Sequence, residues 1–259
     1  MNRICVVIPM FGKEEYTRKC VDLVTENYGT GEPIEILVVD DGSPHEFKDH
    51  KINVIRLEEN SGFTKAANEG ILWAQYRNAD YVLLLNNDTE PRPNFLKSLV
   101  EIMENDPSVG IAGSIREYAN GTIELCGADL IRGHQYLGSK DMDKKPIEVN
   151  WLPLCSALIR MDMIREIGIL DKRFRNHCSD SWYCINAKMH GWKIILDPNS
   201  VVLHHLSVTT TSNNINVEHD QRLLLEKLAC MDQAKLMKEI PLDIEAKTYG
   251  KLSFTVDKK

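Results

Sequence analysis

The stretch from Tyr81 to Asp88 restricts the fold of this chain more than any other. An uncharged run, Tyr81 to Leu85, is followed at once by Asn86, Asn87 and Asp88. An apolar run bounded by polar residues is typical of a strand buried on both faces, as in a parallel sheet. Polar side chains at the carboxyl end of such a strand lie where open α/β sheets bind ligands. The alternative is an ordinary turn in which Asp88 caps the following helix, since aspartates are common in turns.

Strands and helices are predicted to alternate along the first half. Apolar and β-branched runs predict strands, and apolar residues at helical spacing predict helices between them, one capped by Thr64 and a later one, over 94–103, capped by Asn94. This alternation implies an α/β fold with a mostly parallel sheet and right-handed crossovers. The predicted strands are residues 4–8, 34–39, 52–57, 81–86 and 109–115.

Four polar segments each follow the carboxyl end of one of these strands. A parallel sheet brings those ends to one edge, so we expect the four segments to converge on a single crevice. Chance clustering of turn residues explains one or two such segments but not all of them. The four segments are residues 9–11, 40–41, 60–62 and 86–88.

The chemistry of these segments favours a nucleoside diphosphate. An aspartate at a strand end can accept a hydrogen bond from the imide N–H of uracil or thymine, and Phe11 offers a ring for stacking. Gly62 before a helix leaves backbone N–H groups free for phosphate, while Asp88 suits Mg²⁺ or Mn²⁺ shared with the diphosphate. Neither a P-loop motif nor a Gly-x-Gly-x-x-Gly motif follows the first strand.

Composition narrows the class of protein. The chain has 259 residues and a net charge of -7, so nothing global favours nucleic acid or an anionic membrane. No apolar run approaches the roughly 20 residues of a membrane span, and no secretory leader is evident. Seven cysteines without a Cys-x-x-Cys pair are predicted to be reduced thiols, mostly core residues, in a cytoplasmic protein.

Four ordered motifs resemble the family 2 glycosyltransferases, and within them the rhamnosyltransferase-like bacterial branch. They are Val6-Val-Ile-Pro9, Val38-Val-Asp-Asp-Gly-Ser43, Asn60-Ser-Gly-Phe-Thr-Lys-Ala-Ala-Asn-Glu-Gly70 and Leu84-Leu-Asn-Asn-Asp-Thr-Glu90. The resemblance implies a GT-A fold, which is a Rossmann-like, mostly parallel central sheet flanked by helices. It also implies a nucleotide-sugar donor, a divalent cation and inversion at the anomeric carbon.

By motif position, the resemblance implies that Asp41 contacts the base and that Asp88 is the metal ligand of a DxD-like motif. Asn86 stands where many relatives have aspartate, so we expect weaker metal binding. The residues predicted to bind the donor are Pro9, Phe11, Asp40, Asp41, Asn60, Gly62, Lys65, Asn68, Asn86 and Asn87.

A catalytic carboxylate is predicted in the second half. Asp171 to Phe174 resembles the family's Asp-x-x-Phe element, and the segment after it carries Asp180. Relatives usually have acidic residues where this chain has Ser179 and Trp182, so Asp180 is the sole candidate general base of that segment. An acceptor hydroxyl needs such a base. The alternative is that Asp180 is only an N-cap.

Two histidines complete the predicted site. Residues 200–210 resemble the family's strand that ends in His-His-x-Ser-x-Ser/Thr, where a histidine helps to hold the metal or the phosphate. His204 matches that position best and His205 is the second choice. A zinc site built from these histidines with His177 and Cys178 fits no common ligand spacing.

The remaining sequence predicts how the chain is divided. We expect a glycosyltransferase domain over 1–215, with a nucleotide-binding half (1–115) and an acceptor and catalytic half (116–215). A helix over 217–240 and a tail complete the chain. Residues 116–150 are predicted to form exposed loops or a small hairpin, which either select the acceptor or merely connect.

The sequence therefore predicts a metal-dependent, inverting glycosyltransferase that uses a UDP- or dTDP-sugar and a glycan or lipid-linked glycan acceptor. Peripheral contact with the inner face of a membrane and a homo-oligomer are compatible with it. The rivals are a degenerate domain that binds nucleotide-sugar or glycan without transfer, and a sugar-nucleotide pyrophosphorylase. The latter normally needs a Gly-rich loop with Arg or Lys after the first strand, which residues 9–13 do not provide.

Overall fold

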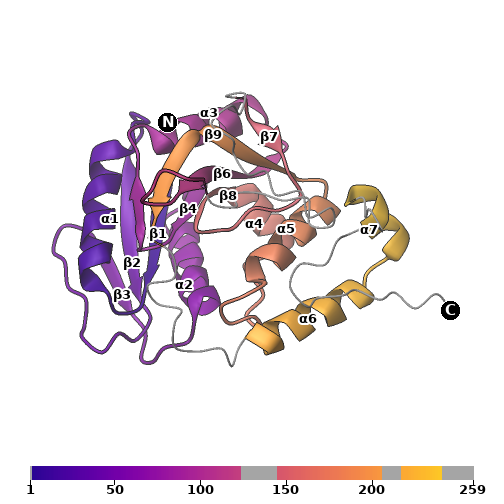
Figure 1. Cartoon of the computed structure of the whole chain (residues 1–259), viewed down its shortest axis with the longest axis horizontal. Helices are drawn as coiled ribbons and strands as arrows, with labels where there is room; N and C mark the ends of the chain where they lie inside the picture. Colours follow the sequence, from indigo (N-terminus) through magenta and orange to yellow (C-terminus); the bar gives the residue numbers. More distant parts are fainter. Residues whose placement is uncertain (1, 124–144, 206–216, 241–259) are drawn as a thin grey trace.

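The first half of the chain forms four parallel strands in the order β3-β2-β1-β4 (Figure 1). The computed structural model describes residues 2–123, 145–205 and 217–240. Because β4 returns to the far side of β1, the carboxyl ends of β1 and β4 form the switch point at which such sheets bind ligands. The elements of this half are β1 (Ile4–Met10), α1 (Glu14–Asn27), β2 (Ile34–Asp40), β3 (Asn53–Arg56), α2 (Phe63–Tyr76) and β4 (Tyr81–Leu85).

The second half extends the sheet beyond β4 through an antiparallel strand. β8 pairs antiparallel with both β4 and β6, and β6 pairs parallel with the long strand β9. The α/β fold with a mixed central sheet flanked by helices is thus confirmed. The further elements are β5 (Thr89–Pro91), α3 (Phe95–Asn105), β6 (Val109–Glu117), β7 (Ile147–Glu148), β8 (Ser156–Arg160), α4 (Met161–Ile167), α5 (Ser179–Met189), β9 (Lys193–His204), α6 (Val217–Ala229) and α7 (Gln233–Glu239).

Helices cover both faces of the sheet and create two hydrophobic cores. Alternate residues of β1 point to opposite faces: Cys5 and Val7 pack towards α2, α4 and α5, and Val6 and Ile8 pack towards α1 and α3. Burial on both faces explains why the strands of the first half appear as continuous apolar runs. The helices also carry the loops at the carboxyl edge of the sheet.

Gly70 allows α2 to approach β1 closely. A Cβ atom at this position would lie 2.0 Å from Cγ1 of Val7, which is fully buried. We therefore expect Gly70→Ala to lower the free energy of unfolding by about 1–3 kcal/mol, the usual cost of overpacking a core. Urea denaturation measures the loss. The double variant with Val7→Ala should lose less than the two single losses added together, and simple additivity would contradict this contact.

One predicted helix start and one predicted helix length are wrong. Thr64 lies inside α2, whose N-cap is Gly62. Asn94 is the N-cap of α3, as predicted, although its backbone is left-handed (φ 63°) and its side chain makes no capping hydrogen bond. The single helix predicted over 217–240 is divided in two. The Asp232 side chain accepts hydrogen bonds from the N–H groups of Ala234 and Lys235 and so starts α7 as a separate helix.

The edges of two strands also differ from the predictions. A short strand, β5, follows Asp88 where a turn was expected, and it pairs antiparallel with β9. β9 begins at Lys193, earlier than predicted, and a register shift between Ser114 and Ile115 of its partner β6 marks a bulge. Most of the loop predicted over 116–150 and the end of the His-His motif lie outside the described residues.

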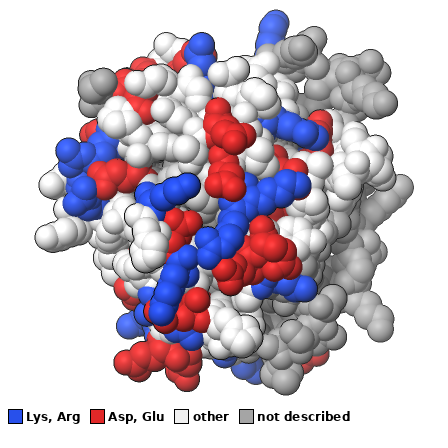
Figure 2. Space-filling view, turned by 90° about the vertical axis from the view of Figure 1, so that its left-hand side faces the viewer, with Lys and Arg blue, Asp and Glu red and all other residues white. Residues whose placement is uncertain are grey.

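The surface on the α1 side of the molecule carries both signs of charge. Figure 2 shows basic and acidic side chains interspersed over this face. On α1 itself, Arg18 forms ion pairs with Glu14 at 2.6 Å and with Asp49 at 3.3 Å. Within the described part of the chain, no helix has the length and apolar character needed to cross a bilayer. The six described cysteines are free, and Cys5, Cys20, Cys155 and Cys184 are buried.

Candidate active site

A crevice opens at the carboxyl edge of the sheet, where the polar segments were predicted to meet. It is lined from β1, β2, β4, β6 and β9 and from the loops before α2 and α5, so residues far apart in sequence share one cavity. Its lining includes Pro9, Phe11, Asp41, Asn60, Gly62, Asn86, Asn87, Asp88, Arg116, Asn176, His177, Ser179, Asp180 and His204.

Asp41 holds the loop that starts α2. Its two carboxylate oxygens accept hydrogen bonds from the N–H groups of Ser61 and Gly62, both at 2.8 Å. Burial raises the pKa of Asp41, although these two hydrogen bonds act in the opposite direction. Gly62 has φ 95°, and a Cβ there would lie 2.7 Å from the carbonyl oxygen of Arg175, so only glycine fits. Asp41 thus fixes one end of the crevice, which the exposed Phe11 also lines.

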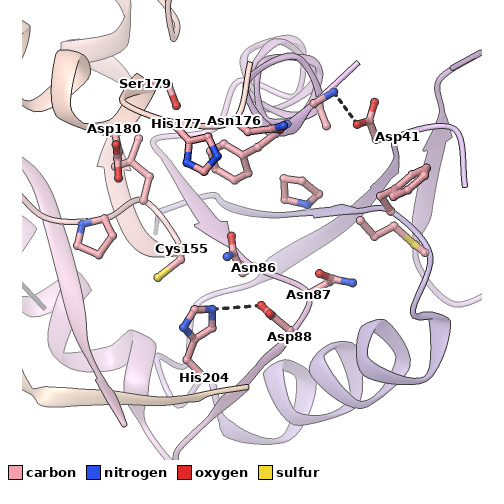
Figure 3. Close-up of a pocket in the computed structure, with 18 of the residues that line it drawn as sticks. Asp41, Asn86, Asn87, Asp88, Cys155, Asn176, His177, Ser179, Asp180 and His204 are labelled. Atoms are coloured by element: carbon pink, nitrogen blue, oxygen red, sulfur yellow. Dashed lines mark hydrogen bonds and ion pairs between the residues drawn. The ribbon is translucent and has the colours of Figure 1, made fainter. Parts of the chain in front are cut away.

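Asp88 and His204 face one another on another side of the crevice (Figure 3). Asp88 follows β4 and His204 ends β9, and Nε2 of His204 lies 3.3 Å from Oδ1 of Asp88. Both side chains are less than one tenth exposed. The pairing of β5 with β9, in which Thr89 is opposite His204, brings the two residues together.

The tripeptide Asn86–Asp88 is anchored to three other elements or their flanking residues. The N–H of Asn86 donates to the carbonyl of Cys155 before β8 at 2.8 Å. The Asn87 side chain donates to the hydroxyl of Thr17 on α1 at 3.0 Å, and the N–H of His205 donates to the carbonyl of Asp88 at 3.0 Å. The candidate metal ligand therefore sits on a backbone with little freedom to move.

Asp180 lies in the first turn of α5 and lines the crevice. Burial raises the pKa of its carboxyl group, while a hydrogen bond from the Ser181 N–H and the charge of Arg116 act in the opposite direction. The N-cap position of α5 is occupied by Cys178, so the alternative that Asp180 is the N-cap is wrong. A carboxylate with a raised pKa that lines a cavity is a typical candidate for acid–base catalysis.

Four predicted site residues lie outside the crevice lining. Asp40 is fully buried and binds Arg56 and the N–H of Ser43, while Asn68 binds both backbone groups of Leu170, at 2.8 and 3.0 Å. Lys65 is exposed and reaches the hydroxyl of Ser61 at 3.3 Å. His205 turns away from Asp88, because its ring bonds Glu90 at 2.5 Å. The side chains of Asp40, Asn68 and His205 thus hydrogen-bond to other parts of the fold and not to the crevice.

The sequence-based prediction missed Arg116, Asn176 and His177, which line the crevice. Arg116 stands near the carboxyl end of β6, which runs two residues past the predicted end of that strand. Arg116 directly follows the predicted strand over 109–115, but it was assigned to the loops predicted over 116–150 and not to the site. Trp182, at one of the positions where relatives are acidic, contacts Lys227 of α6 and is not part of the lining.

The Asp88 end of the crevice fits a divalent cation. A buried carboxylate is the ligand type that Mg²⁺ and Mn²⁺ prefer, and Mg²⁺ usually takes one or two carboxylates together with substrate phosphates. His204 supplies a second donor beside Asp88. No group of three or more His, Cys, Asp or Glu residues that could hold a metal ion occurs among the described residues. The donor set is therefore suited to an ion that is shared with a phosphate-bearing substrate.

Two solved structures with a similar fold are GalNAc-T7 and TarS. The structure described as GalNAc-T7 with UDP, GalNAc and Mn²⁺ matches with a TM-score of 0.63 at 17% identity, over 79% of this chain and 44% of that chain. Staphylococcus aureus TarS matches with a TM-score of 0.63 at 17% identity, over 92% of this chain and 42% of that chain. At these identities the two structures support the fold alone.

Proteins with similar sequences are glycosyltransferases. GlyA, a glycosyltransferase of Streptococcus pneumoniae, is 31% identical over 121 residues, which are 42% of this chain and 16% of GlyA. An N-acetylglucosaminyl-diphospho-decaprenol L-rhamnosyltransferase of Mycobacterium tuberculosis is 23% identical over 224 residues, with 73% of this chain and 72% of the relative covered. The model of the family described as glycosyl transferase family 2 matches residues 5–168, more than half of the chain. The chain belongs to glycosyl transferase family 2.

Proposed function

We propose that this glycosyltransferase moves a sugar from a UDP- or dTDP-sugar to a hydroxyl of a glycan or lipid-linked glycan, with inversion and with Mg²⁺ or Mn²⁺. The observation that carries the proposal is that Asp41, Asp88 and Asp180 line one crevice at the carboxyl edge of the sheet. The M. tuberculosis relative, which is named for a lipid-linked acceptor and a rhamnosyl group, supports this class of acceptor. Peripheral membrane contact and a homo-oligomer stay predictions.

In this mechanism, Asp41 and Phe11 hold the base at one end of the crevice. Asp88 and His204 would hold the cation against the diphosphate, where a bound ion stabilises the negative charge of the leaving group. Asp180 accepts the proton of the acceptor hydroxyl as its oxygen attacks the anomeric carbon. The bond from that carbon to the diphosphate breaks on the opposite face, so one displacement inverts the configuration.

A screen of nucleotides tests the proposal. Melting temperatures are measured with UDP, dTDP, GDP and ADP, each with Mn²⁺, because a ligand at 100 times its Kd stabilises the folded state by about 2.7 kcal/mol. We expect shifts with UDP or dTDP but not with ADP, and smaller shifts in Asp41→Asn, which lacks the imide acceptor. Asp162→Asn, at a carboxylate that is 71% exposed and pairs with Arg165, is the matched control.

The screen is followed by an assay for release of the nucleoside diphosphate from the donor. Release in the presence of an acceptor supports transfer, and slow release without an acceptor supports donor hydrolysis at the same site. A chain that binds UDP or dTDP but releases no product from any donor would be the non-catalytic binder. No shift with any pyrimidine nucleotide would remove the donor assignment.

The pH dependence of transfer should report on Asp180. The base works only when ionised, and its pKa is raised above the ordinary 3.8 by burial, so kcat/KM should fall as the pH drops through that higher value. The charge of Arg116 opposes the effect of burial. In Arg116→Gln the fall of kcat/KM at acidic pH should therefore begin at a higher pH than in the parent. Lys193→Gln, which removes a cation paired with Asp106, is the control and should leave that pH unchanged.

A further inference from the structure

Asp220 of α6 is a fully buried carboxylate that is hydrogen-bonded to three consecutive backbone N–H groups. The N–H groups belong to Arg175 (3.1 and 3.2 Å to the two oxygens), Asn176 (3.0 Å) and His177 (2.8 Å). Burying a charged group is costly unless it is hydrogen-bonded, and here the backbone supplies the bonds. Asp220 thus fixes the path of the 175–177 segment.

The 175–177 segment forms part of the crevice. Asn176 and His177 line it, and Asp180 lies three residues beyond His177 in the first turn of α5. Cys178 between them has a left-handed backbone with φ 58°, so a sharp change of direction connects the segment to α5. The placement of Asp180 therefore depends on where the 175–177 segment is held.

The same segment also contacts the loop that Asp41 holds. The carbonyl of Arg175 accepts the N–H of Thr64 at 3.0 Å, and Oδ1 of Asn176 accepts the N–H of Phe63 at 2.8 Å. The Arg175 guanidinium donates to the carbonyl of Asn60 at 2.9 Å. Residues 175–177 thus connect the end of the crevice near Asp41, where the nucleobase is proposed to bind, with the start of α5.

α6 has contacts of its own that keep Asp220 in place. Lys227 pairs with Asp171 at 2.7 Å, and its ammonium group lies 3.8 Å from the centre of the Trp182 ring. Leu224 and Leu228 pack against a small core that includes Ile185 of α5. The helix therefore contacts α5 beyond the candidate base, at Trp182 and Ile185, and also contacts Asp171 in the segment before α5. Figure 1 shows α6 beside the lower end of α5.

We infer that Asp220 is a positioning residue, which holds the 175–177 segment so that Asp180 meets the acceptor hydroxyl, and that α6 completes the active site. The catalytic part of this inference rests on the proposed function. α6 lies beyond residues 5–168, the part that matches the family model, so the match alone does not assign it a role.

Amide hydrogen exchange tests the structural part without any substrate. In the parent protein the amides of residues 175–177 should exchange slowly although they lie outside any helix or strand. In Asp220→Asn they should exchange at least about tenfold faster, since hydrogen bonds to a charged acceptor are stronger than those to a neutral one. Asp232→Asn is the matched control, because Asp232 also accepts two backbone N–H groups but at the start of α7. Fast exchange of residues 175–177 in the parent would overturn the inference, even if Asp220→Asn did not fold.

Kinetics test the catalytic part at a temperature where each variant is fully folded. We expect kcat of Asp220→Asn to fall by about tenfold to 10²-fold, since a misplacement of about 1 Å can cost that much. The Kd of free UDP or dTDP should change less than kcat, because Asp41 still accepts the N–H groups of Ser61 and Gly62 even where the contacts from residues 175–177 to this loop weaken. Destabilisation alone would change neither value. A fall in kcat of less than about tenfold, or an equal loss in nucleotide affinity, would overturn the positioning role.

The two proposals fail in different ways. If the parent protein neither binds a pyrimidine nucleotide nor releases product from a donor, the proposed function is wrong, and the exchange rates of residues 175–177 still decide the role of Asp220. If the parent transfers sugar and Asp220→Asn transfers it equally well, the function stands and the inference falls.

Discussion

Replacement of Asp180 by asparagine should lower kcat by about 10²–10⁴, the usual effect of losing a positioned general base. Asparagine has the same shape, and its side-chain oxygen can still accept the Ser181 N–H that Asp180 binds at 2.7 Å. It cannot take a proton from the acceptor hydroxyl. Melting temperature and donor affinity should therefore stay close to those of the parent, and steady-state transfer kinetics with donor and acceptor saturating measure the loss.

Asp162→Asn is the matched control for this experiment. Asp162 also lies in the first turn of a short helix, α4, but its side chain is 71% exposed and pairs only with Arg165 among the described residues. Its replacement should leave turnover unchanged. If Asp180→Asn keeps more than about a tenth of the parent rate, another group takes the proton. The next candidates are Asp129 and Glu124, which lie outside the described residues.

Replacement of Asp88 by alanine should abolish most metal-dependent donor binding. The carboxylate is the predicted link between the ion and the diphosphate, and metal stabilisation of such charge is worth several kcal/mol, so we expect a loss in affinity of about 10² or more. Calorimetric titration of UDP or dTDP, with Mn²⁺ and with a chelator, separates this loss from the metal-independent contact with the base. In the chelator, parent and variant should bind alike.

The two adjacent histidines provide an internal comparison. His204 faces Asp88 in the crevice, whereas the ring of His205 bonds Glu90 and lies outside the lining. His204→Ala should weaken donor binding in Mn²⁺, and His205→Ala should leave it unchanged. An Asp88→Ala variant that binds donor in Mn²⁺ as tightly as the parent would disprove the metal assignment.

The sequence predicted the parallel half of the sheet well, because the signals there are local. β4 is buried on both faces, so its apolar run ends sharply at Asn86, and the strand-end rule then placed Asp41, Asn60 and Asp88 around one crevice. The antiparallel insertion of β8 between β4 and β6 could not be predicted in this way. Strand pairing depends on contacts between residues far apart in sequence, and no local pattern encodes them.

Side-chain direction is the feature of the motifs that the sequence could not predict. Asn68 and Asp40 belong to the same motifs as Gly62 and Asp41, yet Asn68 bonds the backbone of Leu170 and Asp40 bonds Arg56. A motif specifies residue types and their order, but one residue along the strand that ends at Asp40 reverses the face to which a side chain points, and each residue along α2, which carries Asn68, also points in a different direction. The sequence also did not reveal the role of Asp220, because a single aspartate in a helix gives no indication of the three distant N–H groups that it binds.

The anchoring of Asn86–Asp88 has a thermodynamic consequence. Because this tripeptide is hydrogen-bonded to Thr17, Cys155 and His205, a ligand that binds Asp88 in this arrangement stabilises the contacts of the tripeptide with α1 and with the end of β9. Linkage is reciprocal, so whatever loosens those contacts weakens the ligand by the same factor. Substrate binding and the resistance of the sheet edge to local opening therefore share one coupling free energy. Thr17→Val, which removes the hydrogen bond to Asn87 but does not alter the crevice lining, should therefore lower the affinity for the ligand.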